Sequence, residues 1–158
     1  MPTFSRNKCV REVRNIAMQK TNNDEVMPMN AGAWKNFFTT CAAILGEGAP
    51  AAAKSNTWCS WTTFKRLRED TGYWQSGLPN PSDIHDEWIG DGGVWGQPFS
   101  YTDLAHIIVP REFYWEQVSQ EGFESGVRVQ DIESLSTELR AKGIEHRKTD
   151  LLLEIKLY

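Results

Sequence analysis

The pattern that most constrains this chain lies between Asp131 and Tyr158, where a helical repeat is followed by a strand repeat. Apolar residues first recur at three- and four-residue steps, as Ile132, Leu135 and Leu139. Asp131 precedes this stripe as a good N-cap, and Gly143 follows it as a C-terminal stop. The spacing therefore predicts a helix from Asp131 to Lys142.

The segment after this helix changes to a period of two. Leu151, Leu153, Ile155 and Leu157 fall on one face of an extended chain. This alternation predicts a final strand over Leu151–Tyr158 that is central or half-buried in a sheet. A short strand over Ile144–Lys148 is expected before it, with a turn at Thr149-Asp150.

The first half of the chain is predicted to be helical. Ser5 caps a basic amphipathic helix that runs to about Lys20. Asn30 caps a second helix, which carries Trp34, Phe37, Phe38, Cys41 and Leu45 and stops at Gly46. A third helix is expected over Ser60–Asp70, with Trp61, Phe64 and Leu67 facing inward. The segment from Gly46 to Ser55 is rich in Gly, Ala and Pro and is predicted to be a mobile loop.

The second half contains strand patterns. Ile84–Ile89 is compatible with an extended segment, the Gly-rich residues 90–93 predict a turn, and Val94-Trp95 is expected to begin the return strand. Leu104–Val109 is predicted to be a buried strand. Arg111–Val118 is predicted to be another strand, in which Tyr114 lies on the face opposite to that of the two aromatic residues beside it. The sequence thus predicts one α+β domain over 1–158, with N-terminal helices followed by a mostly antiparallel sheet and one late helix packed on it.

Length and composition indicate a folded protein without a membrane span. The chain of 158 residues is long enough to bury a core, and its seven Trp exceed what disordered chains contain. The first twenty residues lack a continuous apolar segment, and no run of about 18 apolar residues occurs. The three Cys are widely spaced, which predicts neither a disulfide framework nor a zinc motif. We expect a cytoplasmic protein with no membrane partner.

Charge is distributed unevenly along the chain. Residues 1–80 carry a net charge of +4 and residues 81–158 a net charge of −8. Within the second half, the segment from Asp83 to Glu124 holds nine acids, one base and eight aromatic residues. Carboxylates steer the encounter with a cationic surface, and large rings supply anchors. This acidic aromatic block therefore predicts a surface that docks on a basic protein.

Eight residues of this block are predicted to bind the partner. They combine acids with large rings: Asp86, Glu87, Trp88, Asp91, Trp95, Glu112, Trp115 and Glu116. Trp88, Trp95 or Trp115 is expected near the centre of the surface, and the acids around it. An alternative stays open, in which the rings belong to the hydrophobic core.

A cluster of His and acidic residues offers an enzymatic alternative. Asp83, His85, Asp86 and Glu87 lie together, with Asp103 and His106 downstream. Such residues form acid–base pairs or bind metal ions, so a small hydrolase or nuclease that uses His85, Asp86, Glu87 and His106 is the competing hypothesis. The spacing matches no zinc-hydrolase motif, and neighbouring residues of a strand point in opposite directions. We expect no metal and no cofactor.

Two basic segments raise a third possibility. Arg6–Arg14 and Lys65–Arg68 are the exposed faces of predicted helices, and such faces bind nucleic acid in some proteins. More commonly, such basic residues simply form the solvent-exposed face of a helix. Direct nucleic-acid binding is therefore not expected, although the sequence leaves it open.

The order of these patterns is similar to that of a known group of proteins. An aromatic helix (34–45), the Gly-rich segment between Trp88 and Trp95, the strand before Pro110, a capped helix and a final strand follow one another over about 120 residues. This layout resembles small bacterial α+β immunity proteins of polymorphic toxin systems. The resemblance implies a cytoplasmic antitoxin that neutralises a basic toxin, such as a nuclease. It assigns no functional residue.

Overall fold

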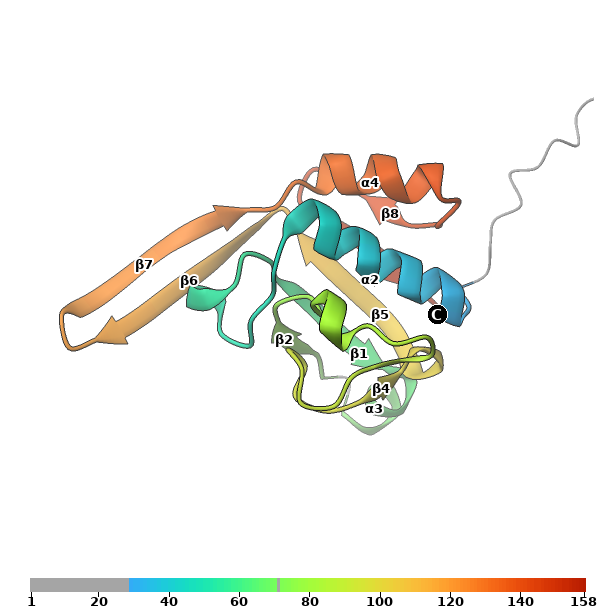
Figure 1. Ribbon diagram of the computed structural model, residues 1–158, viewed down its shortest axis with the longest axis horizontal. Helices are drawn as coiled ribbons and strands as arrows, with labels where there is room; N and C mark the ends of the chain where they lie inside the picture. The colour runs from blue at the N-terminus through green and yellow to red at the C-terminus, as the bar shows by residue number, and fades with distance from the viewer. Residues whose placement is uncertain (1–28, 71) are drawn as a thin grey trace, which may run out of the picture.

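The computed structural model describes residues 29–70 and 72–158, and Figure 1 shows its arrangement. The helix predicted over Ser5–Lys20 lies outside the described residues. Within the described part of the chain, no helix is long and apolar enough to cross a membrane.

The first described helix is α2, Ala31–Leu45, which confirms the prediction. Asn30 caps it, because its side-chain Oδ1 accepts a hydrogen bond from the Ala33 amide at 2.9 Å. Gly46 ends it with a φ of +94°, a conformation that favours glycine. The inward face of α2 is aromatic and fully buried, with Trp34, Phe37 and Phe38 among the core residues.

The body of the molecule is built on a five-stranded antiparallel sheet of order β2-β1-β5-β9-β8. Its strands are β1 (Cys59–Thr63), β2 (Trp74–Ser76), β5 (Leu104–Pro110), β8 (Arg147–Lys148) and β9 (Leu152–Lys156). Helix α2 lies across this sheet, and the late helix α4, Ile132–Ala141, packs beside α2 (Figure 1). The α+β class is therefore confirmed.

Three predicted elements of the body appear nearly as expected. Strand β5 occupies the centre of the sheet and is buried along most of its length. Strand β9 pairs with β5 and β8, with Leu153 and Ile155 buried. In α4, Asp131 accepts a hydrogen bond from the Ser134 amide at 2.9 Å, and the predicted stripe of Ile132, Leu135 and Leu139 is completely buried.

The prediction of a helix over Ser60–Asp70 is wrong for its first half. Residues 59–63 form β1, because Trp61 and its neighbours pair with both β2 and β5. Helix α3 begins only at Phe64 and ends at Glu69, with Thr63 as its N-cap. Phe64 is exposed, not inward-facing. Sheet pairing on both sides outweighed the local helical spacing.

The segment after the Gly-rich turn also differs from the prediction. Strand β3 is limited to Trp88–Ile89, and its partner is β4, Phe99–Ser100, not Val94-Trp95. Asp83 organises the loop between them, because its buried carboxylate accepts hydrogen bonds from the Val94 amide at 3.0 Å and the Asn80 amide at 3.1 Å. The loop thereby returns Trp95 to the core.

Three short 3-10 helices complete the connections: η1 (Ala52–Lys54), η2 (Pro81–Asp83) and η3 (Tyr101–Asp103). The segment Gly46–Ser55, expected to be a mobile loop, contains η1 and is tied down by hydrogen bonds. The Gly48 amide donates to Asn80 Oδ1 at 2.7 Å, and the Ala49 amide donates to Ser55 Oγ at 2.8 Å.

A further β structure projects from the body. Strands β6 (Glu112–Ser119) and β7 (Gly122–Val129) pair only with each other and form a long hairpin, which we call the arm. Figure 1 shows it projecting away from the sheet and helices. Strand β6 matches the predicted strand over Arg111–Val118, whereas β7 was not predicted.

Candidate protein-docking surface

The register of the arm assigns every side chain to one of two faces. Tyr114 lies opposite Val127, and Val118 lies opposite Phe123. Because side chains alternate along a strand, the front face of the arm consists of Glu112, Tyr114, Glu116, Val118, Phe123, Ser125, Val127 and Val129. The back face carries the intervening residues.

The front face is apolar and exposed. Five of its eight side chains are large and hydrophobic, namely Tyr114, Val118, Phe123, Val127 and Val129, and each is between 57% and 80% exposed. Scattered apolar residues are normal on a protein surface, but a contiguous apolar face commonly marks an interaction site. The front face is therefore the first candidate for protein contact.

The back face is anchored to the body near its root. Phe113 is buried, and its ring stacks on Trp58 with 5.8 Å between centroids. Arg128 lies over the Trp115 ring at 5.2 Å. The Arg128 guanidinium also donates hydrogen bonds to the backbone carbonyls of Ala52, Ala53 and Ser55, in and beside η1. The back face of the arm is thus fixed at the root, while the front face remains in solvent along its whole length.

Gly126 shows how closely the back face is packed. A Cβ atom at this position would lie only 2.9 Å from Trp115 Nε1 and 3.1 Å from the neighbouring ring carbons. The Trp115 ring therefore rests on the bare backbone of Gly126. This contact leaves Trp115 half-buried and turned away from the front face.

The root of the arm is clamped by a buried glutamine. Gln130, directly after β7, donates from Nε2 to the carbonyl of Trp58 at 2.9 Å and of Pro110 at 2.7 Å. Its Oε1 accepts a hydrogen bond from the Trp58 amide at 2.9 Å. Its own amide donates to the Arg111 carbonyl at 2.6 Å. Gln130 thus ties both strands of the arm to β1 and β5.

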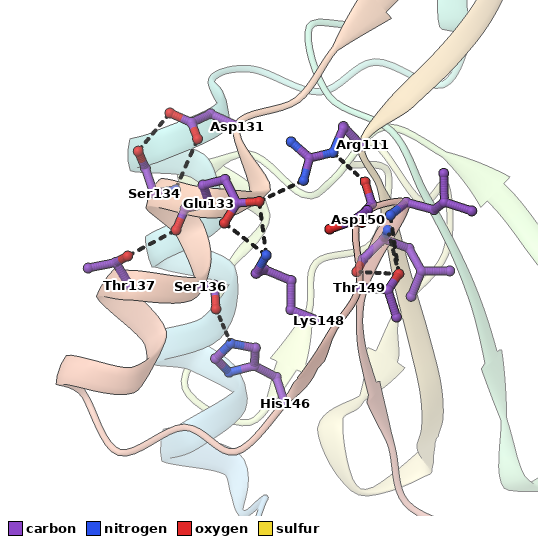
Figure 2. A network of polar contacts seen from close by, with 12 residues as sticks. Arg111, Asp131, Glu133, Ser134, Ser136, Thr137, His146, Lys148, Thr149 and Asp150 are labelled. Carbon is purple, nitrogen blue, oxygen red and sulfur yellow. Dashed lines mark hydrogen bonds and ion pairs between the residues drawn. The ribbon is translucent and has the colours of Figure 1, made fainter.

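A polar network on the outside supports the same root (Figure 2). Arg111 Nη2 donates to Glu133 Oε1 at 2.6 Å, and Arg111 Nε donates to the Asp150 carbonyl. Lys148 Nζ lies 2.8 Å from the other oxygen of Glu133. The hydrogen bonds from Lys148 and then from Arg111 lower the pKa of the Glu133 carboxyl. This network joins the start of β6 to α4 and β8.

The charge of the arm is strongly negative. Between residues 112 and 129 there are four carboxylates, Glu112, Glu116, Glu121 and Glu124, and one base, Arg128. Glu112 and Glu116 lie on the front face, Glu121 is in the turn and Glu124 is on the back. Within the described part of the chain, none of the four forms an ion pair. The apolar front face is thus surrounded by unpaired negative charge.

The structure divides the eight predicted site residues into separate regions. Asp86, Glu87, Trp88 and Asp91 lie around β3, all exposed. Asp86 forms an ion pair with Lys35 at 2.5 Å near the start of α2. The hydrogen bond and the charge of Lys35 lower the pKa of the Asp86 carboxyl. The arm leaves the molecule beyond the other end of α2 (Figure 1), so Asp86 does not share a surface with Glu112 and Glu116.

Two of the three expected aromatic anchors, Trp95 and Trp115, are corrected, whereas Trp88 is exposed. Trp95 is a core residue, because its ring stacks on Trp61 with 4.1 Å between centroids and an interplanar angle of 5°. Trp115 is packed against Gly126. The rings that the front face exposes are Tyr114 and Phe123 instead, neither of which was predicted as an anchor. Phe123, Val127 and Val129 stand at even spacings, as apolar residues on one face of a strand do. This pattern is the sequence signal for the exposed position of Phe123.

The enzymatic alternative requires His85 and His106 to act together, and the structure gives them different surroundings. His85 is exposed and stacks on Trp88 with 5.2 Å between centroids. His106 is buried in β5, where Nε2 lies 2.9 Å from Glu154 Oε2 and Nδ1 lies 2.7 Å from the Tyr73 hydroxyl. No contact joins the two histidines among the described residues.

The surroundings of His106 fit a structural role. Burial tends to raise the pKa of Glu154, but hydrogen bonds from His106 and Arg147 outweigh this effect and lower the pKa. Burial, followed by the hydrogen bond with Tyr158, raises the pKa of Tyr73 to about 12. The Tyr73 hydroxyl therefore keeps its proton at neutral pH and is a poor nucleophile. The network links β5 and β9 to the residues before β2.

Comparison with known proteins adds no relative. No family model matches this chain, and neither the curated proteins nor the solved structures give a significant match.

Proposed function

We propose that this protein binds a basic protein through the front face of its arm. The observation that carries the proposal is the segregation of five exposed apolar residues onto one face of a hairpin whose other face is packed on the body at its root. An isolated two-stranded hairpin is at best marginally stable in water, and its apolar face favours a partner that covers it. Tyr114 and Phe123 are the proposed anchors.

The charge of the arm supports a cationic partner. Four carboxylates against one guanidinium create a negative field around the apolar centre. Such a field accelerates encounter with a basic surface and opposes docking on an acidic one. Arg128 does not offset this field on the front face, because it lies on the back beside η1.

The attachment of the arm supports a role as a rigidly held binding surface. Gln130 and the Arg111–Glu133 network hold both strands at the root. A surface held in its binding geometry loses less conformational entropy when it binds. The arm therefore presents its front face in a defined direction, which suits insertion into a concave site.

We further propose that the partner is a toxin, and that this protein acts in the cytoplasm as its antitoxin or immunity protein. Enzymes that cleave nucleic acids are commonly basic because they bind phosphates. An acidic arm with apolar anchors suits the phosphate-binding cleft of such a toxin and would block it sterically and electrostatically. The resemblance in layout to immunity proteins points the same way.

The test is neutralisation of the product of the gene immediately upstream. That product is expected to arrest growth when expressed alone and to be harmless when this protein is co-expressed. Tyr114→Ser combined with Phe123→Ser is expected to weaken binding by on the order of 2 kcal/mol or more and to restore toxicity. Glu112→Lys with Glu116→Lys is expected to slow association and flatten its salt dependence.

The matched control replaces two exposed apolar residues outside the arm. Phe64→Ser with Leu151→Ser removes a comparable amount of exposed apolar surface and is expected to leave neutralisation intact. The proposal fails if the upstream product is not toxic or not neutralised. It also fails if the Tyr114/Phe123 variant folds normally and still protects the cell.

A further inference from the structure

The arm has an open edge as well as an exposed face. Strand β7 has β6 as its single neighbour in the sheet pairing, so its other edge meets no strand among the described residues. On the opposite side of the arm, η1 packs beside β6. Strand β7 is eight residues long and contains neither Pro nor Lys, two of the residues that protect an edge strand from pairing. The open edge of β7 can therefore pair with a strand of another chain.

The register determines which residues direct their amides toward this edge. The Gln130 amide bonds to the Arg111 carbonyl, so that pair is hydrogen-bonded across the hairpin. Because hydrogen-bonded and non-hydrogen-bonded pairs alternate, Val129, Val127, Ser125 and Phe123 belong to non-hydrogen-bonded pairs. Their N–H and C=O groups point away from β6, toward the open edge.

Charges on β7 are arranged symmetrically about one residue. Glu124 and Arg128 lie two positions on either side of Gly126, all three on the back face. The described hydrogen-bond partners of the Arg128 guanidinium are neutral carbonyls, and no carboxylate pairs with it. Glu124 has no cationic partner within the same part of the chain. A two-fold axis through Gly126 would bring each of these charges opposite its complement.

We propose that two copies of this protein associate through their β7 strands, antiparallel and with Gly126 at the two-fold axis. The hairpins then join into a four-stranded sheet of order β6-β7-β7-β6. Glu124 of each copy then lies opposite Arg128 of the other, so residues of opposite charge face each other in both halves of the contact. The outward amides of Phe123, Ser125, Val127 and Val129 find acceptors on the second copy.

The apolar residues fit the same register. Phe123 of one copy lies opposite Val129 of the other, an aromatic and β-branched pair of the kind that stabilises sheets. Ser125 lies opposite Val127. Gly126 meets Gly126 at the axis, where the absence of side chains permits close approach. Packing the two front faces against each other is disfavoured, because it brings Glu112 and Glu116 of both copies together.

Edge pairing leaves the front face exposed in both copies. It places two such faces side by side in one sheet, which doubles the apolar surface offered to a partner. Dimerisation is measured on the purified protein alone, so its failure does not depend on the toxin partner proposed above.

The test is the mass of the full chain by sedimentation equilibrium over a range of concentrations. The wild type is expected to approach twice the chain mass of 18.0 kDa. Ser125→Pro removes an outward N–H without breaking a bond to β6 and is expected to raise the dimer dissociation constant at least about tenfold. Ser125→Ala keeps the N–H and is the matched control, expected to dimerise like the wild type.

Charge reversal provides a second, independent set of variants. Glu124→Arg places two guanidinium groups opposite each other at both ends of the contact and is expected to weaken the dimer. Glu116→Arg makes the same change in charge on β6, one strand away, and is expected to have little effect. A monomeric wild type overturns the proposal. The proposal is also overturned if Glu116→Arg weakens the dimer while Ser125→Pro and Glu124→Arg do not.

Discussion

The body and the arm use similar residues for opposite purposes. In the body, Trp34, Phe38, Trp61 and Trp95 pack against one another and are almost inaccessible to solvent. In the arm, Tyr114 and Phe123 are more than half exposed. Both regions are rich in aromatic and β-branched residues. The difference lies in the number of layers, because the body sheet is covered by helices and the front face of the arm is not.

This contrast shows that an aromatic, acidic composition does not by itself locate a binding surface. Trp95 and Tyr114 both belong to the acidic aromatic block, yet one is in the core and the other is in solvent. What separates them is a second layer, supplied for Trp95 by Phe38 of α2 and Trp61 of β1. Stability is therefore expected to depend on the body, and binding on the arm.

The largest expected effect separates Trp95 from Trp88. Trp95→Ala removes a fully packed ring and is expected to lower the free energy of unfolding by about 3–5 kcal/mol. Trp88→Ala removes a half-exposed ring and is expected to cost much less, because nearly half of its surface is already hydrated. Urea denaturation of both variants measures the difference. Equal losses would contradict the assignment of Trp95 to the core.

The next comparison sets α4 against the front face of the arm. Leu135→Ala and Leu139→Ala are each expected to cost about 2–5 kcal/mol of stability, because both side chains are completely buried. Val118→Ala is expected to change stability by about 0.5 kcal/mol or less. Thermal and chemical unfolding provide the values. If Val118→Ala proved as destabilising as the leucine variants, the front face would be covered in solution.

A smaller effect is expected at the junction of the two regions. Gln130→Ala leaves the Trp58 amide and the Trp58 and Pro110 carbonyls without their side-chain partner, which is expected to cost about 1–3 kcal/mol. The loss should loosen the arm more than the body. Amide hydrogen exchange is expected to rise mainly in β6 and β7. Uniform acceleration across β5 and α4 would show that Gln130 supports the whole fold.

The smallest expected effect depends on pH. Since the folded-state pKa of Glu154 is lowered, its contribution to stability is present above the unfolded pKa of about 4.3 and is lost as the pH falls through the folded value. Glu154→Gln should therefore be less stable than the wild type at neutral pH, with the gap closing as the pH falls below that unfolded value. Urea titrations across this range test it. If the difference in stability between the two proteins widened in acid, the expected direction of the pH dependence would be contradicted.

Elements with a strong local signal were predictable from the sequence. The capped stripes of α2 and α4 and the apolar run of β5 needed no knowledge of distant contacts. The strand β1 was not predictable in this way, because Trp61 and Phe64 have helical spacing and only pairing with β2 and β5 makes residues 59–63 extended. Long-range hydrogen bonding decided that segment.

The candidate site was predictable in composition but not in geometry. Glu112 and Glu116 are exposed on the arm as expected, since acids are rarely buried. The faces of the arm depend on the register with β7, a strand that was not predicted from the sequence. Only that register places Trp115 on the packed back and Phe123 on the exposed front. Asp86 was grouped with them by sequence position, although Lys35 holds it elsewhere.

The topology of the body also affects the order of folding. Strand β9 lies between β5 and β8, yet it is synthesised after every other described strand. The five-stranded sheet therefore cannot be completed until the segment 152–156 has left the ribosome. The hairpin of β6 and β7 involves only neighbouring residues, and such hairpins form in about 1–10 μs. A nascent chain would thus display its apolar hairpin before its core has closed, and at that stage exposed apolar surface and an unpaired strand edge favour aggregation.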